Sequence, residues 1–531
     1  MPVHDESPPA EPLTMANGVR PAPAPPAPAA RSTGAAARRP VRILGRIPGR
    51  WRAPIAVYAV TQLIFLLWWA AFYPGLMSYD SVIYLLHVTT GPWVDNHSVL
   101  YDSMVWLSLH TTGGLAALTL VQTVAMSASL GYTVAALRRL GVRGRWTGIA
   151  AVIVAALPPT GAFIVFIWKD VPFTICAFLM VPTLAHLISL RGVPGWRRDR
   201  RVNGLIGALG LELLGLMLFR LNGFIIVALT AAVLVALLAG VRWRVAAVAV
   251  AGIFLALFLN LVVYPAAGIQ KPNSSLSFGP AYADIAVAYA EQPSSFSAAD
   301  TRLMARVAPL SAWRKSADCY DSDPTTTIPG FTPRAARLSS QLVSLWLQVL
   351  KRSPNLILGA RICRGSIAWS IFASGGHNGE TLVPVDKVPA NLFLLASQVR
   401  GNPYRPALRT APLSWKLNAA ANFLWNASLT AQFQWLLWRG AFWCYLSYIV
   451  LFAYSRARRN WAVLSLGAIL IGQQLGVLAD VPAQLYRYMV SPIIIGIMLV
   501  PLFFARRRRD SVGDRAEQDA AGHGQVLGDG S

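Results

Sequence analysis

Acidic and basic side chains recur at the short polar breaks between long apolar segments of this chain. Asp80, Asp95 and His97 follow the first apolar segment, and Lys169 and Asp170 lie together at a later break. A carboxylate held beside a hydroxyl group can remove its proton as a general base. Ammonium and guanidinium groups stabilise phosphate oxygens as negative charge develops on them. These residue types therefore fit chemistry in which a hydroxyl group is deprotonated next to a bound phosphate.

The first break is organised by a helix stop. Tyr73-Pro74-Gly75 ends the preceding apolar helix, because proline cannot continue a helix and glycine tolerates the turn. Asp80 follows five residues after glycine, at the start of a helix expected over 79–90. We assign the role of catalytic base to Asp80. Asp95 is assigned to loop structure or acceptor contact, since a first loop is often polar for no chemical reason.

Two arginines lie at other breaks. Arg220 occupies a tight turn before Asn222, where it is either an interfacial anchor or a bidentate ligand for an anionic head group. Arg487 precedes Tyr488 where the last apolar segment begins. Both arginines sit at segment ends, where a charge can reach water, so we expect Arg220→Ala and Arg487→Ala to weaken phosphate binding more than folding. The candidate substrate-binding residues are Asp95, Asn96, His97, Lys169, Arg220, Asn222, Arg487 and Tyr488.

Composition identifies the class of fold that must position these residues. Of 531 residues, 55% are hydrophobic and 13% are charged, and the mean hydropathy is +0.47, which is far from a soluble domain. We predict an all-α polytopic membrane protein with about ten transmembrane helices and helices on the outer surface in its first loop. The predicted spans are 54–72, 114–137, 147–167, 171–190, 203–219, 221–240, 244–264, 433–455, 461–479 and 486–505. Pro158-Pro159 predicts a kink in the third span.

The net charge of +24 is distributed as topology signals rather than as a nucleic-acid patch. Arginine clusters recur at alternate ends of the predicted spans, which the positive-inside rule assigns to the cytoplasm. The ten spans then alternate without conflict in a multi-pass plasma-membrane protein with both termini cytoplasmic. The stretch 99–109 must not cross, and we predict a second surface helix there. All the candidate residues then face the outside.

The chain divides at composition changes. We predict a disordered cytoplasmic tail over 1–53, a bundle of seven spans over 54–264 that includes a catalytic first outer loop at 73–113, an extracytoplasmic and mostly helical domain over 265–432, three spans over 433–505, and a cytoplasmic tail over 506–531. Cys319 and Cys363 both fall in the outer domain, and we predict a disulfide between them. Glu212 is the one carboxylate well inside a predicted span, and no partner for it is evident.

These features together resemble the GT-C superfamily of membrane glycosyltransferases, such as protein O-mannosyltransferases, aminoarabinose transferases and arabinosyltransferases. The resemblance covers roughly 54–505 and rests on short motifs: the first-loop Asp80 after the Tyr-Pro-Gly break, Asp170 between two spans, the outer domain, and the late Arg487-Tyr488 pair. It implies transfer of a sugar from a polyprenyl-phosphate donor to an envelope glycan, lipid or protein at the outer face. By the same resemblance, Asp80 and Asp170 match the two acidic catalytic positions and Arg487 matches the arginine on the phosphate side. Ser81 follows Asp80 where the family commonly has an Asp-Glu pair, so the use of a divalent cation stays open, and no other cofactor is expected.

Two other classes remain open from sequence alone. A lipid or oligosaccharide transporter or flippase places ionisable groups near the membrane midplane, and only Glu212 does so here. A non-catalytic envelope assembly protein is the second alternative. Neither the sugar nor the acceptor follows from the sequence.

Overall fold

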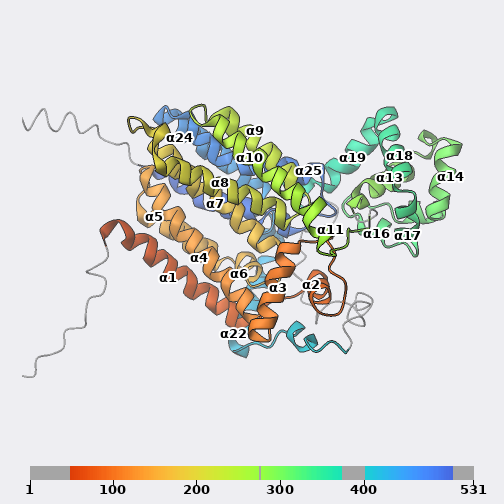
Figure 1. Ribbon diagram of the computed structural model, residues 1–531, viewed down its shortest axis with the longest axis horizontal. Coiled ribbons are helices and arrows are strands. Elements are labelled where there is room, and N and C mark those ends of the chain that lie inside the picture. Colours follow the sequence, from red (N-terminus) through yellow and green to blue (C-terminus); the bar gives the residue numbers. More distant parts are fainter. Residues whose placement is uncertain (1–47, 274–276, 374–400, 506–531) are drawn as a thin grey trace, which may run out of the picture. The chain divides into compact units, whose positions relative to one another are not determined.

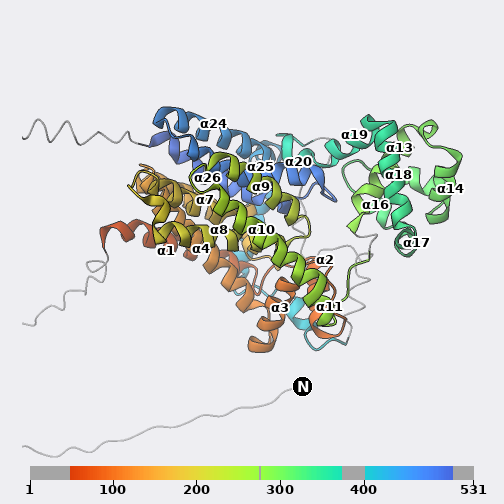
Figure 2. The same ribbon diagram turned by 45° about the horizontal axis from the view of Figure 1, so that its top comes forward.

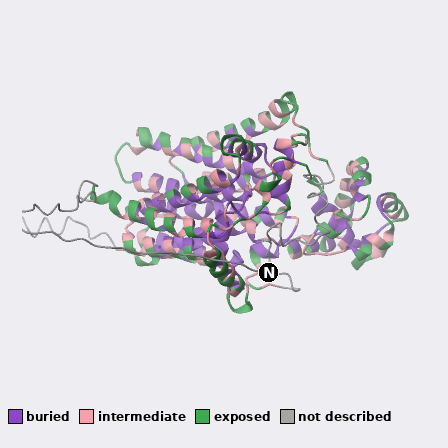
Figure 3. Ribbon diagram, turned by 90° about the horizontal axis from the view of Figure 1, so that it is seen from below, coloured by how far each residue is buried: buried purple, intermediate pink, exposed green. Residues whose placement is uncertain are grey.

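The computed structural model describes residues 48–273, 277–373 and 401–505. This part of the chain is helical and has no strand, only isolated bridges between loops (Figures 1 and 2). Figure 3 shows that its buried residues gather in the middle of the helical bundle. Residues 1–47 and 506–531 of the predicted tails lie outside the described residues. The end of the first predicted tail, 49–53, is helical, because the first helix begins at Gly49 rather than at residue 54.

Six helical segments are long and apolar enough to cross a membrane. They are α1 (Gly49–Ala71), α4 (Ala116–Arg139), α7 (Asp170–Leu190), α8 (Arg200–Phe219), Arg242–Ala266 and Trp461–Ala479. The segment Arg242–Ala266 comprises α10 (Arg242–Phe258), η3 (Leu259–Val263) and α11 (Tyr264–Ala266), and Trp461–Ala479 comprises η8 (Trp461–Gly467) and α25 (Ala468–Ala479). The described chain is thus that of a multi-pass membrane protein.

Four further segments decide how many spans there are. α5 (Gly144–Ala156) and α6 (Pro158–Ile164) are bent by 71° at the two prolines, as the sequence predicts, and α23 (Ala431–Leu437) and α24 (Ala441–Arg458) are bent by 52°. If each bent pair is one span, the described residues contain eight. The last two predicted spans are short helical segments, α9 (Gly223–Leu237) and Val490–Phe504, the latter made of α26 (Val490–Leu499) and η10 (Val500–Phe504). Ten spans therefore stay a prediction.

The first loop contains the two helices that the sequence predicts there. α2 (Tyr79–Thr89) begins at a capping arrangement in which the Ser78 backbone N–H donates to Ser81 Oγ at 3.0 Å. α3 (Val99–Thr112) begins at Ser98, whose side chain accepts from the Tyr101 backbone N–H. A serine caps the start of each helix, so the loop has a defined backbone on which side chains can be positioned.

A smaller group of helices has its own hydrophobic core. The group comprises α13 (Gly279–Glu291), α14 (Ala298–Val307), α15 (Leu310–Lys315), α16 (Asp323–Thr326), α17 (Phe331–Arg337), α18 (Ser339–Arg352) and α19 (Pro354–Arg364). Asp284 holds α13 against α19 by ion pairs of 2.5 Å each to Arg361 and Arg364. The core ends near Ile357, whereas α20 (Ser366–Trp369) and α22 (Trp415–Ser428) contribute side chains to the core of the bundle. The helices around this second core therefore run from Gly279 to Arg364, within the predicted domain of 265–432.

Cys319 and Cys363 form a disulfide in the structure, with 5.6 Å between their Cα atoms. It closes a separation of 44 residues around the domain core. We expect the double replacement Cys319→Ser/Cys363→Ser to lower the free energy of unfolding by about 2–4 kcal/mol, because the unfolded chain regains its freedom. Thermal unfolding measures the change. Alkylation of both thiols in intact, non-reduced protein would contradict the pairing.

Arginine-bearing helix ends contact one another at one end of the bundle. Arg138 Nη1 donates to the backbone oxygen of Arg50 at 2.9 Å, and Arg244 Nη1 donates to that of Arg197 at 2.6 Å. In Figure 1 the starts of α1, α5 and α10 lie at the opposite end from α2 and α3. The arginine clusters and the first loop therefore lie at opposite ends, as the alternation of charge predicts.

Which end faces the cytoplasm is a prediction that labelling tests. We expect Tyr79→Cys to react with an impermeant maleimide on intact cells and Trp243→Cys to react only after permeabilisation, since these side chains are exposed at opposite ends. Tyr79 and Trp243 are 46% and 75% exposed, so both positions are accessible. Cys176 and Cys444 are replaced first, because they are free thiols. The reverse pattern would place the first loop inside.

Candidate functional site

The backbone before Asp80 is fixed against the loop that precedes α7. Leu76 donates its N–H to Val165 O at 3.0 Å, and its carbonyl accepts from the Ile167 N–H at 2.9 Å. At Gly75 a Cβ atom would lie 2.7 Å from Thr119 Cγ2 and 2.8 Å from Val165 O, so a larger residue would separate the two segments. This pairing carries Asp80 and Asp170 to the same place, although they are far apart in sequence.

Side-chain hydrogen bonds complete the connection between loops. Trp168 Nε1 donates to Ser78 Oγ at 2.5 Å, and Ser81 Oγ donates to Ile167 O at 2.9 Å. Ser98 Oγ donates to Leu218 O at 2.8 Å, which ties the first loop to the end of α8, just before Arg220. Three polar breaks of the bundle are thereby held together.

Four charged residues from four segments form a chain of ion pairs, which we call the ion cluster: Asp80, Arg487, Asp170 and Arg220. Arg487 Nη1 contacts Asp80 Oδ2 and lies 3.9 Å from Asp170 Oδ2, and Arg220 Nε lies 3.4 Å from Asp170 Oδ1. The side chains of Asp170 and Arg220 are 2% and 5% exposed. Arg487 and Asp80 are 17% and 13% exposed, so the cluster opens toward solvent on their side.

Aromatic rings hold the two guanidinium groups in place. The Arg220 guanidinium carbon lies 4.4 Å from the centre of the Tyr488 ring and 4.9 Å from that of Phe173. That of Arg487 lies 5.3 Å from the Tyr488 ring and 5.1 Å from the Trp168 ring. Tyr488 therefore contacts both arginines, and cation–π attraction fixes their positions where little water is present.

A third cation extends the site toward the first loop. Lys169 Nζ donates to His97 Nδ1 at 2.9 Å. Burial and the nearby Lys169 charge hold the pKa of His97 well below its usual value, so the imidazole is neutral and accepts this bond. Burial lowers the pKa of Lys169 to about 8, although Asp80 and Asp170 oppose the shift. Lys169 is therefore mostly cationic at pH 7 and loses its charge a little above it.

The site carries an excess of positive charge and unused hydrogen-bonding capacity. Lys169, Arg220 and Arg487 outnumber the carboxylates of Asp80 and Asp170 by one. Arg220 Nη1 and Arg487 Nε are buried and donate no hydrogen bond to a protein atom. Buried donors of this kind are costly unless a ligand or water accepts from them. The arrangement suits an anion with several acceptor oxygens, such as a phosphate.

Asp80 is ionised at the edge of this cluster. Burial alone would raise the pKa of its carboxyl, but the Arg487 and Lys169 cations outweigh burial and hold the pKa well below its usual value. A carboxylate so strongly paired is a weak base.

The other predicted site residues lie around the cluster or apart from it. Asn222 Nδ2 donates to Asp480 O at 3.0 Å, which fixes the turn after Arg220 to the last loop. Asn96 Oδ1 is buried without a hydrogen-bond partner. Glu212 accepts from Thr183 Oγ1 at 2.6 Å within the bundle, which supplies the partner that the sequence does not reveal.

The expectation that Arg220 can reach water is wrong. Arg220 is only 4% exposed, and its guanidinium group pairs with the buried Asp170. Replacing Arg220 alone therefore leaves a buried carboxylate without its counter-charge, which harms folding as well as binding. The turn sequence conceals this because the packing partners, Phe173 and Tyr488, come from distant segments.

Sequence reasoning also missed two acidic residues near the site. Asp102 Oδ2 pairs with His87 Nδ1 at 2.9 Å, and both residues are buried between α2 and α3. Asp323 is brought near by the domain, since the Ser322 N–H donates to Pro482 O at 2.8 Å. The surrounding protein and the neighbouring Asp321 raise the pKa of Asp323 to about 6. The only indication of the His87–Asp102 pair in the sequence is that these residues fall in two consecutive predicted helices, 79–90 and 99–109.

Asp95 lies beside the cluster without an ion pair of its own among the described residues. Its N–H donates to Gln270 O at 2.9 Å. Burial raises the pKa of its carboxyl to about 6, although Lys169 opposes the shift. A raised carboxyl pKa means that the folded protein holds the proton more tightly than the unfolded chain, so this contribution to stability is present below pH 4 and lost as pH rises through 6.

We therefore expect Asp95→Asn to raise the unfolding temperature at pH 7.5 and to leave it unchanged near pH 4. The amide keeps the size of the side chain and carries no charge at either pH. Thermal unfolding of both proteins across this pH range is the measurement. A gain that is the same at pH 4 and pH 7.5 would refute the assigned titration.

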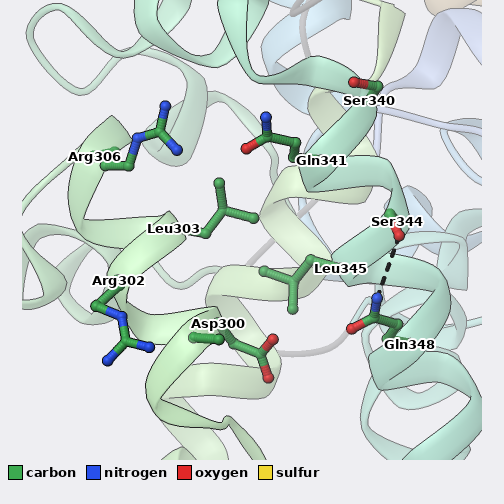
Figure 4. Close-up of a pocket in the computed structure, with 10 residues that line it drawn as sticks. Asp300, Arg302, Leu303, Arg306, Ser340, Gln341, Ser344, Leu345 and Gln348 are labelled. Atoms are coloured by element: carbon green, nitrogen blue, oxygen red, sulfur yellow. Dashed lines mark hydrogen bonds between the residues drawn. The ribbon is translucent and has the colours of Figure 1, made fainter.

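Two further features bear on what the site can hold. In the residues that the structure describes, no three His, Cys, Asp or Glu side chains gather as a metal site. A cavity of about 710 Å³ lies apart from the ion cluster, between α14 and α18 of the domain (Figure 4). Its walls carry Arg302, Arg306 and Gln341 but no predicted site residue.

No family model, curated protein or solved structure matches this chain.

Proposed function

We propose that this protein is a glycosyltransferase of the GT-C type that transfers a sugar from a polyprenyl-phosphate donor to a cell-envelope acceptor. The observation that carries the proposal is the ion cluster with the neighbouring Lys169, which together hold one more cation than carboxylate and have unused arginine donors, at one end of an apolar helical bundle. A phosphate held by a lipid tail would meet apolar helices and cationic groups together. We place the reaction at the extracytoplasmic face.

The donor phosphate binds where the guanidinium groups have spare donors. Arg487 and Arg220 donate to its oxygens, and Lys169 supplies a further charge nearby. The phosphate then competes with Asp80 for Arg487, which weakens the ion pair that keeps Asp80 a poor base. Asp80 therefore becomes a stronger base only after the donor has bound.

The transfer step uses Asp80 as the base. The acceptor hydroxyl loses its proton to Asp80 as its oxygen bonds to the anomeric carbon, and the bond from that carbon to the phosphate oxygen breaks. The electron pair of that bond leaves with the lipid phosphate, whose growing charge Arg487, Arg220 and Lys169 stabilise. Asp170 does not touch the reacting atoms in this scheme; it positions Arg220 and Arg487 through its ion pairs.

A gradient-free transfer assay tests the proposal. Purified protein in detergent is incubated with labelled polyprenyl-phosphate hexoses and pentoses and with membrane extracts as acceptor source. Release of polyprenyl phosphate together with a labelled acceptor is the expected result. A protein that consumes no donor of the panel, while remaining folded by thermal unfolding, would contradict the assignment as a transferase of these donors.

Transport is the second candidate, and one observation favours it. Glu212 lies inside α8 with Oε2 buried and unpaired, and intramembrane carboxylates are common in transport pathways. A transporter needs sealed vesicles and moves its lipid without breaking the sugar–phosphate bond. Labelled lipid that changes leaflet intact in proteoliposomes, with no product in detergent, would favour this candidate.

A further inference from the structure

A second group of cations lies at the arginine-rich end, away from the ion cluster. Arg50 and Trp51 of α1, Arg138 and Arg139 of α4, and His186 of α7 line a cavity of about 230 Å³. We call it the basic pocket. Its lining residues include no carboxylate, and within the described residues none of its three arginines forms an ion pair with an acidic side chain.

The geometry holds these cations together rather than apart. Arg138 Nη1 donates to the backbone oxygen of Arg50 at 2.9 Å, which joins the start of α1 to the end of α4. His186 packs against Tyr132, with 5.1 Å between ring centres, so α7 forms the third wall. Positive-inside topology requires arginines at this end but does not require three of them to line one cavity. Their mutual repulsion is relieved when an anion enters.

The surroundings of the pocket favour an anion that carries apolar chains. Trp51 and Ile55, one helical turn apart on α1, are 45% and 43% exposed, and Leu63 farther along is 61% exposed. This outward apolar face of α1 begins at the pocket. A cavity of about 230 Å³ is smaller than the usual range for a whole drug-sized ligand, so it admits a head group and leaves the chains outside.

We propose that the basic pocket binds the phosphodiester head group of an anionic phospholipid, with the acyl chains lying along α1. Basic pockets between helix ends at an interface have the charge and shape for such head groups. This inference is independent of the proposed transfer reaction, because the pocket shares no residue with the ion cluster.

Native mass spectrometry and thermal unfolding of the full-length protein test the inference. The protein in detergent is titrated with phosphatidylglycerol, with phosphatidylcholine of the same chains, and with soluble glycerol phosphate. We expect phosphatidylglycerol to be retained and to raise the unfolding temperature, while phosphatidylcholine does neither. Glycerol phosphate that binds as well as the lipid would overturn the lipid as ligand and assign the pocket to a free phosphate.

Paired variants locate the site. We expect Arg138→Gln/Arg139→Gln to weaken phosphatidylglycerol binding by about tenfold or more, the scale of losing charge-assisted hydrogen bonds. The control Arg198→Gln/Arg200→Gln removes the same charge elsewhere among the arginine clusters and leaves binding unchanged. Equal losses in both variants would overturn the pocket in favour of diffuse attraction. If the first variant does not fold, Arg139→Gln alone serves, since Arg139 is exposed.

Discussion

Replacing Asp80 by asparagine is expected to lower turnover of the proposed transfer by about a hundred- to ten-thousandfold, the usual contribution of a general base. Asparagine keeps the size of the side chain and can still accept a hydrogen bond from Arg487. It lacks the charge that takes the acceptor proton. Release of polyprenyl phosphate from a labelled donor, measured under single-turnover conditions, reports the loss without interference from donor affinity.

Two controls separate chemistry from structure in that experiment. Asp95→Asn changes a neighbouring carboxyl in the same way, and we expect it to keep most of the turnover, because Asp95 makes no ion pair with Arg487. Donor affinity of Asp80→Asn should equal or exceed that of the natural protein, since the phosphate no longer competes with a carboxylate for Arg487. Near-full turnover in Asp80→Asn would remove Asp80 from the mechanism and leave the resemblance to support the fold alone.

The second large effect concerns the buried pair of Asp170 and Arg220. Each single change, Asp170→Asn or Arg220→Gln, is expected to lower the free energy of unfolding by about 3–5 kcal/mol, because it leaves the partner's charge buried without compensation. The two side chains are 2% and 5% exposed, so water cannot replace the lost partner. Arg487 lies 3.9 Å from Asp170 and reduces the cost of the Arg220 change.

The double variant distinguishes a pair from two independent residues. We expect Asp170→Asn/Arg220→Gln to be much less destabilised than the sum of the single variants, with a coupling of about 1–3 kcal/mol. Unfolding in detergent provides the measurement. Additive losses would mean that the two residues act separately. Donor affinity should nevertheless fall in the double variant, because it has lost one of the phosphate-binding cations.

The convergence of the charged residues could be predicted because charge and hydropathy determine topology before any packing is known. Asp80, Asp170, Arg220 and Arg487 were assigned to one face from the alternation of arginine clusters, and the structure brings these four side chains into contact. Which arginine pairs with which aspartate could not be predicted. Nothing local indicates that Arg487 pairs with Asp80 while Arg220 is buried against Asp170.

Other features depended on packing between distant segments. The His87–Asp102 pair requires the angle between α2 and α3, which periodicity does not give. Residues 366–432 read as part of the outer domain because they are polar, yet Trp425 of α22 packs in the bundle core. Hydropathy alone likewise does not determine the number of spans, since α9 is strongly apolar but has only 15 residues.

The ion pair between Asp80 and Arg487 joins positions that are 407 residues apart. During synthesis, every other member of the cluster has left the ribosome long before Arg487 does. Until then Asp80 has no arginine partner from the last loop, and Asp170 has only Arg220. The site therefore cannot assemble until synthesis has passed residue 487, and a chain truncated before Arg487 leaves Asp80 without its arginine partner.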